Sequence, residues 1–256
     1  MDEPPVIELM GADIPWSDNP SATPVARNVN WKIEAGHFWA IGASAGSGKS
    51  DLLCTAAGLV RPLSGELALF GKRVKQMHEE ELVATRLKVA MVFDSGRLFS
   101  HLTVAENIGL PIEYHEGIRP HRAKERILFA LELAGIAQLA DQFPRMVPRA
   151  LHQRVALARA LALSPDVLLV DNPLLAVDQR NARWWVDFLC AAHAGKTALG
   201  KALTLVVAVD DLRPWLDAAQ QFGVVRDRRF EIIDGHEEVI NASEEVVRDL
   251  FNPASE

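Results

Sequence analysis

The succession of strand, glycine-rich turn, Lys-Ser pair and helix in residues 38–60 constrains this chain more than any other feature. An apolar run at 38–41 leads into GASAGSGKSD, and the apolar helical pattern LLCTAAGLV follows. Such a turn directs backbone N–H groups and a helix N-terminus at an anion. It predicts a phosphate-binding loop in which Lys49 contacts the terminal phosphates of a nucleotide and the Ser50 hydroxyl reaches Mg²⁺. The residues predicted to contact the nucleotide in this loop are Ser44, Gly46, Ser47, Gly48, Lys49, Ser50 and Asp51.

The first glycine of this loop departs from the usual spacing. The pattern expects glycine at position 43, where the chain has Ala43, and Gly42 comes one place early. Because alanine adopts positive φ poorly, we expect a slightly distorted loop. The alternative, a glycine-rich turn without a ligand, is disfavoured because the later glycines, the lysine and the serine are spaced correctly.

Short apolar runs alternate with helical patterns along the rest of the chain. Most of the runs are apolar at every position, which is typical of a parallel sheet covered by helices on both faces. We therefore predict an α/β fold with strands at 38–41, 89–93, 167–170, 203–209 and 222–225. Helical periodicity is clear at 122–134, 151–163 and 181–192. Residues 94–166 are mostly helical in pattern, which indicates a helical insertion rather than a single crossover.

The stretch VLLVDNP, residues 167–173, predicts a buried strand that ends at a polar site. Asp171 at the end of this strand is placed to bind Mg²⁺ or its waters, because hard cations prefer oxygen ligands. A helix N-cap is the alternative role for an aspartate in this position. The phosphate-binding loop upstream favours the metal site.

Composition limits the classes of ligand. The formal net charge of −7 and the pI near 5.6 disfavour a nucleic-acid binder, whose affinity rests largely on Lys and Arg. The two cysteines, Cys54 and Cys190, lack metal spacing and indicate neither a zinc site nor a disulfide framework, which fits a reducing cytosol. We find no apolar run near the roughly 18 to 20 residues of a membrane span, and no signal-peptide pattern at the N-terminus.

The two sites above and the segments around the second one resemble the nucleotide-binding subunits of ABC transporters. RVALARALALSPDVLLVDNPLLAVD, residues 154–178, is similar to the signature helix, the Walker B strand and the D-loop that ends at Asp178. The resemblance implies a P-loop NTPase fold with a RecA-like ABC ATPase core at 1–93 and 164–235. It implies a helical subdomain at 94–163, with the Q-loop and the signature, and a C-terminal tail at 236–256. Its cofactors would be ATP or ADP and Mg²⁺.

FDSGRLFSHLTVAENIGLPI, residues 93–112, resembles the segment after the Q-loop in the subfamily that serves MCE and Mla-type phospholipid or sterol transport. The tail EVVRDLFNP, residues 245–253, is also similar to that subfamily. Trp16 stands where the family has an aromatic residue that stacks on adenine, although packing is an alternative for one of six tryptophans. The implied partners are a membrane permease, contacted by the Q-loop and the helical subdomain, and a second nucleotide-binding subunit. The implied location is the cytoplasmic face of the inner membrane.

Three positions depart from the family pattern where the chemistry occurs. Asn172 stands at the place of the glutamate that polarises the attacking water, and an amide cannot take the proton. General-base help is worth roughly 10² to 10⁴ in rate, and a simple hydrogen-bonding role for Asn172 predicts the same loss. Asp210 replaces the switch histidine, and its carboxylate would repel the γ-phosphate unless it turns away. Asp94 replaces the Q-loop glutamine and can still serve as a Mg²⁺ ligand.

The signature departs furthest. The Leu-Ser-Gly-Gly motif of the family, which would meet the nucleotide of the partner subunit together with Asp178, is replaced by VPRAL, residues 147–151. Pro148 offers neither a hydroxyl nor an N–H group, and Arg149 adds bulk before Ala150 where a backbone must approach closely. Arg149 could instead act as an arginine finger toward the nucleotide across the interface.

Three interpretations follow. The first is an ABC subunit that binds ATP or ADP, hydrolyses it slowly or not at all, and contributes structure or regulation to a lipid-transport complex. The second is a working ATPase in which Arg149 and a competent partner rebuild one active site. The third is a P-loop kinase or a nucleotide-sensing regulator without a transporter, which the ABC order of the motifs disfavours.

Overall fold

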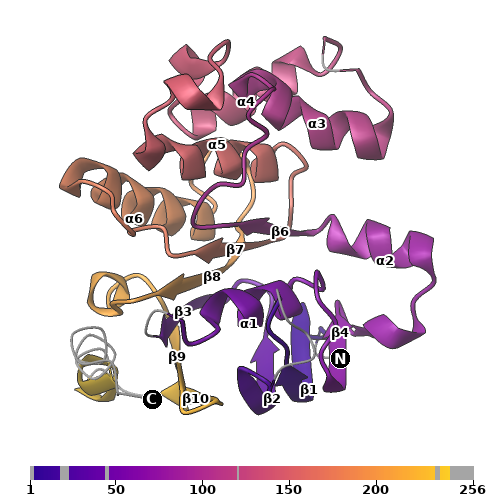
Figure 1. Cartoon of the computed structure of the whole chain (residues 1–256), viewed down its shortest axis with the longest axis vertical. Coiled ribbons are helices and arrows are strands. Elements are labelled where there is room, and N and C mark those ends of the chain that lie inside the picture. The colour runs from indigo at the N-terminus through magenta and orange to yellow at the C-terminus, as the bar shows by residue number, and fades with distance from the viewer. Residues whose placement is uncertain (1–2, 18–22, 44–45, 120, 234–236, 243–256) are drawn as a thin grey trace.

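The computed structural model describes residues 3–17, 23–43, 46–119, 121–233 and 237–242, and its strands form two sheets (Figure 1). The first sheet is antiparallel and four-stranded. Its strands are β1 (Ile7–Ile14), β2 (Ala26–Ile33), β4 (Ser64–Leu69) and β5 (Lys72–Arg73), in the order β2-β1-β4-β5. The sequence analysis did not predict this sheet.

The second, central sheet has six strands in the order β10-β9-β3-β8-β7-β6. It is parallel from β9 to β6, and β10 is antiparallel to β9. The five predicted strands are all confirmed here, with small shifts at their ends. The strands are β3 (Phe38–Ala43), β6 (Val89–Val92), β7 (Val167–Asp171), β8 (Thr204–Val209), β9 (Gln221–Arg226) and β10 (Arg229–Ile233).

Six α-helices lie between these strands in the described residues up to 233. They are α1 (Lys49–Ala56), α2 (Glu79–Arg86), α3 (Val104–Glu116), α4 (Lys124–Leu133), α5 (Arg149–Leu161) and α6 (Gln179–His193). The three helices predicted from periodicity are confirmed as α4, α5 and α6, whereas the apolar pattern after the glycine-rich turn placed the start of α1 too late. Short 3₁₀ helices occur at Val74–Gln76, Ala137–Leu139, Pro144–Met146 and Arg213–Trp215, and residues 237–242 are helical. The proposed family tail at 245–253 lies outside the described residues.

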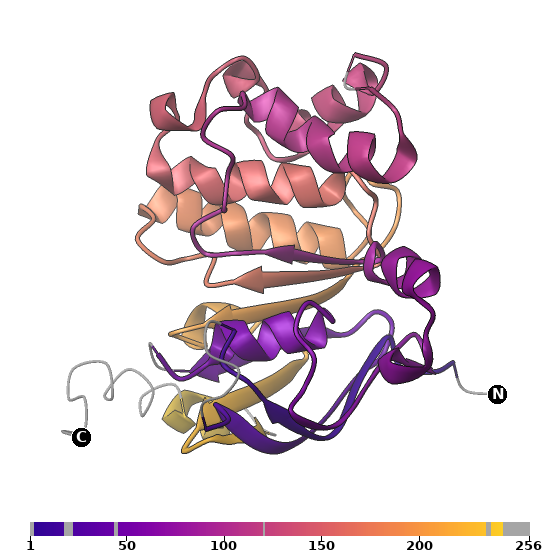
Figure 2. The same ribbon diagram turned by 45° about the vertical axis from the view of Figure 1, so that its right-hand side comes forward.

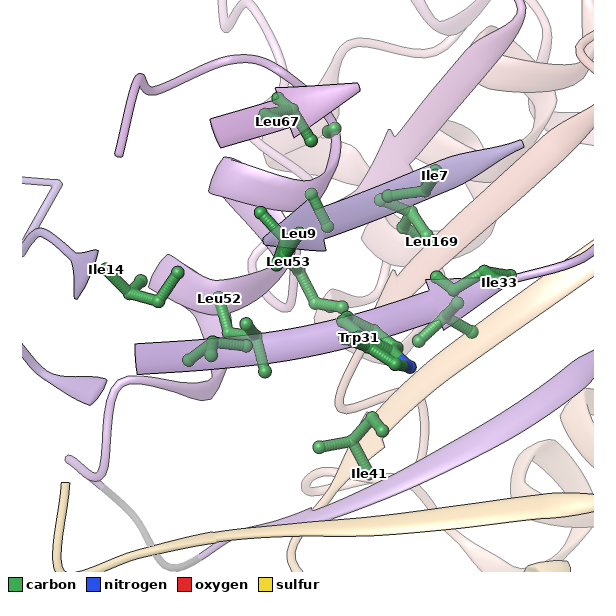
Figure 3. Packing of buried hydrophobic residues seen from close by; sticks show 14 of the residues in the cluster. Ile7, Leu9, Ile14, Trp31, Ile33, Ile41, Leu52, Leu53, Leu67 and Leu169 are labelled. Carbon is green, nitrogen blue, oxygen red and sulfur yellow. The ribbon is translucent and has the colours of Figure 1, made fainter. Parts of the chain in front are cut away.

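Helix α1 lies between the two sheets and shares one hydrophobic core with both. Leu52 and Leu53 of α1 pack among Trp31 of β2, Ile41 of β3 and Leu169 of β7 (Figure 3). The Trp31 side chain is 1% exposed, and both leucines are completely buried. Burying a leucine of this kind contributes roughly 1.5–3 kcal/mol, so this layer fixes α1 against the central sheet.

Helices α5 and α6 cover the opposite face of the central sheet (Figure 2). Alternate residues of β7 serve the two cores, because Val167 and Leu169 face α1 whereas Leu168 and Val170 face α5 and α6. This explains why the strand is apolar at every position. A third core joins α3 and α4 to the outer side of α5.

The parallel arrangement brings three chain segments to one edge of the sheet. β3, β8 and β7 are neighbours, so the glycine-rich turn after β3, Asn172 after β7 and Asp210 after β8 all leave the sheet at its carboxyl edge. Ligands of open α/β sheets bind at this edge. Among the described residues, none of the helices is both long and apolar enough to cross a bilayer.

Candidate functional site

The glycine-rich turn ends at Gly48, whose position requires glycine for two reasons. Its φ is 86°, in the left-handed region, and a Cβ there would lie 2.5 Å from the Val25 side chain. Gly46 also has a positive φ of 78°. Ala43, by contrast, is the last residue of β3 and has no positive φ, so the distortion expected from alanine at this position is not required. Ser44 lies outside the described residues.

A cavity of about 260 Å³ opens beside this turn. The described residues that line it include one lysine and four aspartates, which gives them a formal charge of −3. A bare anion would be repelled from such a cavity, so an anionic ligand would need a cation beside it. The lining residues are Trp16, Gly46, Gly48, Lys49, Ser50, Asp51, Asp94, Asp171, Asn172, Leu175 and Asp210.

Lys49, Asp210 and Asn172 form a continuous polar network in this cavity. The Lys49 ammonium pairs with Oδ1 of Asp210. Oδ2 of the same carboxylate accepts a hydrogen bond of 2.7 Å from the Asn172 amide. Asp210 therefore does not turn away from the phosphate-binding loop, and Asn172 makes the hydrogen bond to a neighbouring loop that was its alternative role. Asn172 has a positive φ of 49°, which asparagine adopts more readily than most residues.

Asp171 and Ser50 lie beside this network. Asp171 is 2% exposed, and its Oδ2 accepts a hydrogen bond of 2.6 Å from the Ser50 hydroxyl. Burial raises the pKa of Asp171, the Ser50 hydrogen bond opposes this, and the nearby Asp94 and Asp210 carboxylates raise it further. The helix-cap alternative for Asp171 is wrong, because the next helix, α6, begins at Gln179 and has Asp178 as its N-cap.

The surroundings of Asp171 fit a divalent cation. Its buried Oδ1 has no hydrogen-bond partner among the described residues. Among the residues that the structure describes, no three His, Cys, Asp or Glu side chains form a group that could hold a metal ion by themselves. Mg²⁺ commonly takes one or two carboxylates and completes its shell with substrate phosphates and water. The orphaned oxygen, the Ser50 hydroxyl and the exposed Asp94 across the cavity match that mode of binding.

Trp16 is held at the rim of the cavity by its neighbour. The backbone N–H and the hydroxyl of Ser17 both bond Oδ1 of Asp51, at 2.7 Å and 2.5 Å. Trp16 is half-buried, lines the cavity and also packs against the core beneath α1. Both of its predicted roles, stacking on a base and packing, are compatible with this position.

The segment predicted to be the signature, residues 147–151, lies elsewhere. Pro148 is the N-cap residue of α5 and makes no side-chain cap, and Arg149 is exposed beside it. Arg149 and Ala150 border a second cavity of about 440 Å³, and the described linings of the two cavities have Asp94 and Leu175 in common. The structure thus separates the residues predicted to act across an interface from the phosphate-binding loop. Asp178 caps α6 through Asn181, with its Oδ1 accepting a hydrogen bond of 2.8 Å from the backbone N–H.

The sequence analysis missed the structural roles of two residues near the site. Gln153, 5% exposed on α5, donates a hydrogen bond of 2.6 Å to the Asp171 carbonyl and so ties α5 to the end of β7. Gly42 allows the buried Leu212 side chain to approach, since a Cβ would lie 2.8 Å from it. The sequence around Gln153 gives no local signal of its hydrogen-bond partner. Gly42 was noticed as an early glycine, but it was interpreted as part of the loop rather than as a packing position.

Comparisons with known proteins agree with this arrangement. A family model described as ABC transporter matches residues 26–175. A solved structure of the ATP-binding cassette MJ0796, a dimer in a post-hydrolysis state bound to ADP and Pi, has a TM-score of 0.76 and 26% identity. That match covers 90% of this chain and 100% of the other. The similarity agrees with the ABC order of the motifs, which disfavoured a P-loop kinase or a nucleotide-sensing regulator without a transporter.

Two curated relatives are similar at the level of sequence. The methionine import ATP-binding protein MetN of Carboxydothermus hydrogenoformans is 32% identical over 79% of this chain and 58% of the relative. The trimethylamine N-oxide transport system ATP-binding protein TmoW of Ruegeria pomeroyi is 31% identical over 84% of this chain and 62% of the relative. The chain thus spans less than two thirds of the length of these relatives. The match over residues 26–175 shows that the chain belongs to the ABC transporter family.

Proposed function

We propose that this chain is a nucleotide-binding subunit of an ABC transporter that binds a Mg²⁺-nucleotide and hydrolyses it slowly or not at all. The observation that carries the proposal is the network of Lys49, Asp210 and Asn172. It occupies the positions where the family resemblance implies a catalytic glutamate and a switch histidine. The groups for binding phosphate are therefore retained, while the groups for activating water are replaced.

The binding half of the proposal rests on three side chains. Lys49 is 8% exposed and points its ammonium into the cavity, where it can contact phosphate oxygens. The Ser50 hydroxyl and the orphaned Asp171 oxygen would hold Mg²⁺, which neutralises phosphate charge. The formal charge of −3 in the cavity explains why the cation is needed for the nucleotide to enter.

The catalytic half rests on position 172, where the family resemblance implies a glutamate and this chain has Asn172. Asn172 cannot accept a proton from water, because its amide has no basic site near neutral pH. The Asp210 carboxylate is engaged by Lys49 and Asn172, and Asp171 accepts from Ser50. A missing general base costs roughly 10² to 10⁴ in rate.

The exposed guanidinium of Arg149 favours a second candidate, a working ATPase. Arg149 borders the second cavity at the start of α5, where a partner subunit could present its nucleotide. A guanidinium pairs well with phosphate oxygens and can replace a backbone anion site. This candidate would require the partner to supply the base that Asn172 lacks.

The proposed partners are a membrane permease, contacted through residues 94–163, and a second nucleotide-binding subunit. Dimer formation is supported by the dimeric ATP-binding cassette of similar fold. Lipid as the transported molecule rests on the resemblance of residues 93–112 and of the tail at 245–253 to one subfamily. The names of the two relatives describe import of methionine and transport of trimethylamine N-oxide, so the cargo stays a prediction.

Calorimetric titration and an ATPase assay on the purified chain test the proposal. We expect Mg²⁺-nucleotide binding that weakens at least about tenfold in Lys49→Ala, together with turnover at least about 100-fold below a family member with an intact glutamate. Rapid hydrolysis that Lys49→Ala abolishes would overturn it. In the assembled complex, loss of turnover on Arg149→Ala would support the second candidate instead.

A further inference from the structure

The Asp210 carboxylate is held next to Lys49, the lysine of the phosphate-binding loop, and neutralises its charge. One oxygen pairs with the Lys49 ammonium, and the other accepts the 2.7 Å hydrogen bond from Asn172. Asn172 is anchored in turn, because its backbone N–H donates to the Ala208 carbonyl of β8 at 2.7 Å. Leu212, two residues after Asp210, is completely buried against Gly42. The carboxylate is therefore preorganised from both sides.

We propose that Asp210 makes the site selective for nucleoside diphosphates over triphosphates, an inference that rests on the proposed nucleotide-binding function. Among the described residues that line the cavity, Lys49 is the one cation. A phosphate-binding lysine of this kind reaches both the β- and the γ-phosphate of a triphosphate. In this chain a carboxylate already holds the ammonium as a terminal phosphate would.

The free energy of binding should then differ between a nucleoside diphosphate and a nucleoside triphosphate. A diphosphate can contact Lys49 through its β-phosphate while the ion pair with Asp210 stays intact. A γ-phosphate must share the ammonium with the carboxylate or displace it, and either choice brings two anions together beside Asp171 and Asp94. Asn172 strengthens this discrimination, since it donates a hydrogen bond that keeps Asp210 in place.

Titration of the full chain with Mg²⁺-ADP and Mg²⁺-ATP tests the inference. We expect wild type to bind ADP at least about tenfold more tightly than ATP, about 1.4 kcal/mol. Asp210→Asn keeps the shape of the side chain and removes its charge, so it should reduce this ratio by about tenfold, mainly by strengthening ATP binding. Asp210→Ser, a smaller neutral variant, repeats the measurement if the asparagine variant does not fold.

Asp211→Asn is the matched control. It changes the net charge equally one residue away, at a carboxylate that pairs with Arg213 and does not line the cavity. Wild type that binds ATP as tightly as ADP, an unchanged ratio in the Asp210 variants, or an equal shift in Asp211→Asn would each overturn the selectivity. Binding of neither nucleotide would overturn the proposed function as well, and the Lys49→Ala variant shows whether any binding that occurs uses this site.

Discussion

Replacing Asn172 by glutamate should destabilise the fold through the neighbouring carboxylate. The Asn172 amide donates to Asp210 at 2.7 Å, and Asn172 is 7% exposed. A glutamate at this position exchanges a hydrogen bond for two like charges in a largely buried place. Asn172→Gln is the matched control, because glutamine has the length of glutamate and meets the same backbone requirement at φ 49° without the charge.

The size of the effect follows from the geometry. Two unit charges about 4 Å apart repel by about 4 kcal/mol at an effective dielectric of about 20, and losing the hydrogen bond adds about 1 kcal/mol. The Asp210 side chain is 23% exposed and is paired with Lys49, so solvent and the ammonium both reduce the repulsion. We expect the glutamate variant to be about 2 kcal/mol less stable than the glutamine variant.

Urea unfolding followed by tryptophan fluorescence measures this difference, since Trp31, Trp185 and Trp215 are fully buried and report on the core. Repeating the pair of substitutions in an Asp210→Asn background completes a double-mutant cycle. The penalty of the glutamate should shrink by most of its value there, because only the charge at position 210 has been removed.

Two results would refute this reasoning. Equal stability of the two variants would mean that the glutamate and Asp210 do not face each other. A penalty that persists unchanged in the Asp210→Asn background would assign the repulsion to another carboxylate, such as Asp171.

Three other predictions concern α3 and the metal. The pKa of Glu106 is lowered, chiefly by the Thr103 backbone hydrogen bond of the capping box, so its contribution to stability is present above about pH 4.3 and is lost as pH falls through the lower folded-state pKa. Glu106→Gln should therefore lower the free energy of unfolding at pH 7 and match wild type in strong acid, as urea titrations across pH can check. Asn107→Leu should lower the free energy of unfolding by about 2 kcal/mol in the same assay, because the buried Asn107 amide hydrogen-bonds the Phe99 backbone and two further carbonyls. An unchanged free energy of unfolding would contradict this. Removing Mg²⁺ with a chelator should weaken ADP binding at least about tenfold, and Asp171→Asn should remove most of that dependence in calorimetric titrations.

The sequence predicted five of the six strands of the central sheet and missed β10, because an apolar run marks a strand that is buried on both faces. Val167, Leu168, Leu169 and Val170 alternate between two cores, so a continuous apolar run implies cover on both faces. The antiparallel sheet gave a weaker signal. β1 has register shifts on both sides and a positive φ of 57° at Gly11, which interrupt the alternation expected of a strand with one buried face.

One part of the candidate site is encoded by neighbouring residues and could be predicted, whereas another part depends on residues that are far apart in the sequence. The phosphate-binding loop is contiguous, so the spacing of Gly46, Gly48 and Lys49 was sufficient to predict it. The ion pair between Lys49 and Asp210 joins residues 161 positions apart, and no local pattern encodes it. The residue type at position 210 was enough to anticipate repulsion between its carboxylate and a phosphate. The ion pair of Asp210 with Lys49 and its hydrogen bond with Asn172 depend instead on the order of β3, β8 and β7 in the sheet.

Asn172 and Asp210 are joined by a hydrogen bond, so a substitution at either position changes the surroundings of the other. An asparagine amide both donates and accepts, so it can pair with a carboxylate or with an imidazole at position 210. A glutamate at position 172 can pair only with the imidazole, because with Asp210 it forms two like charges beside Lys49. A glutamate restored alone would thus lack the surroundings in which it could act as a base, since Asp210 would still occupy the ammonium. The loss of hydrolysis that we propose resides in the pair, so we expect glutamate at position 172 to restore hydrolysis only together with histidine at position 210.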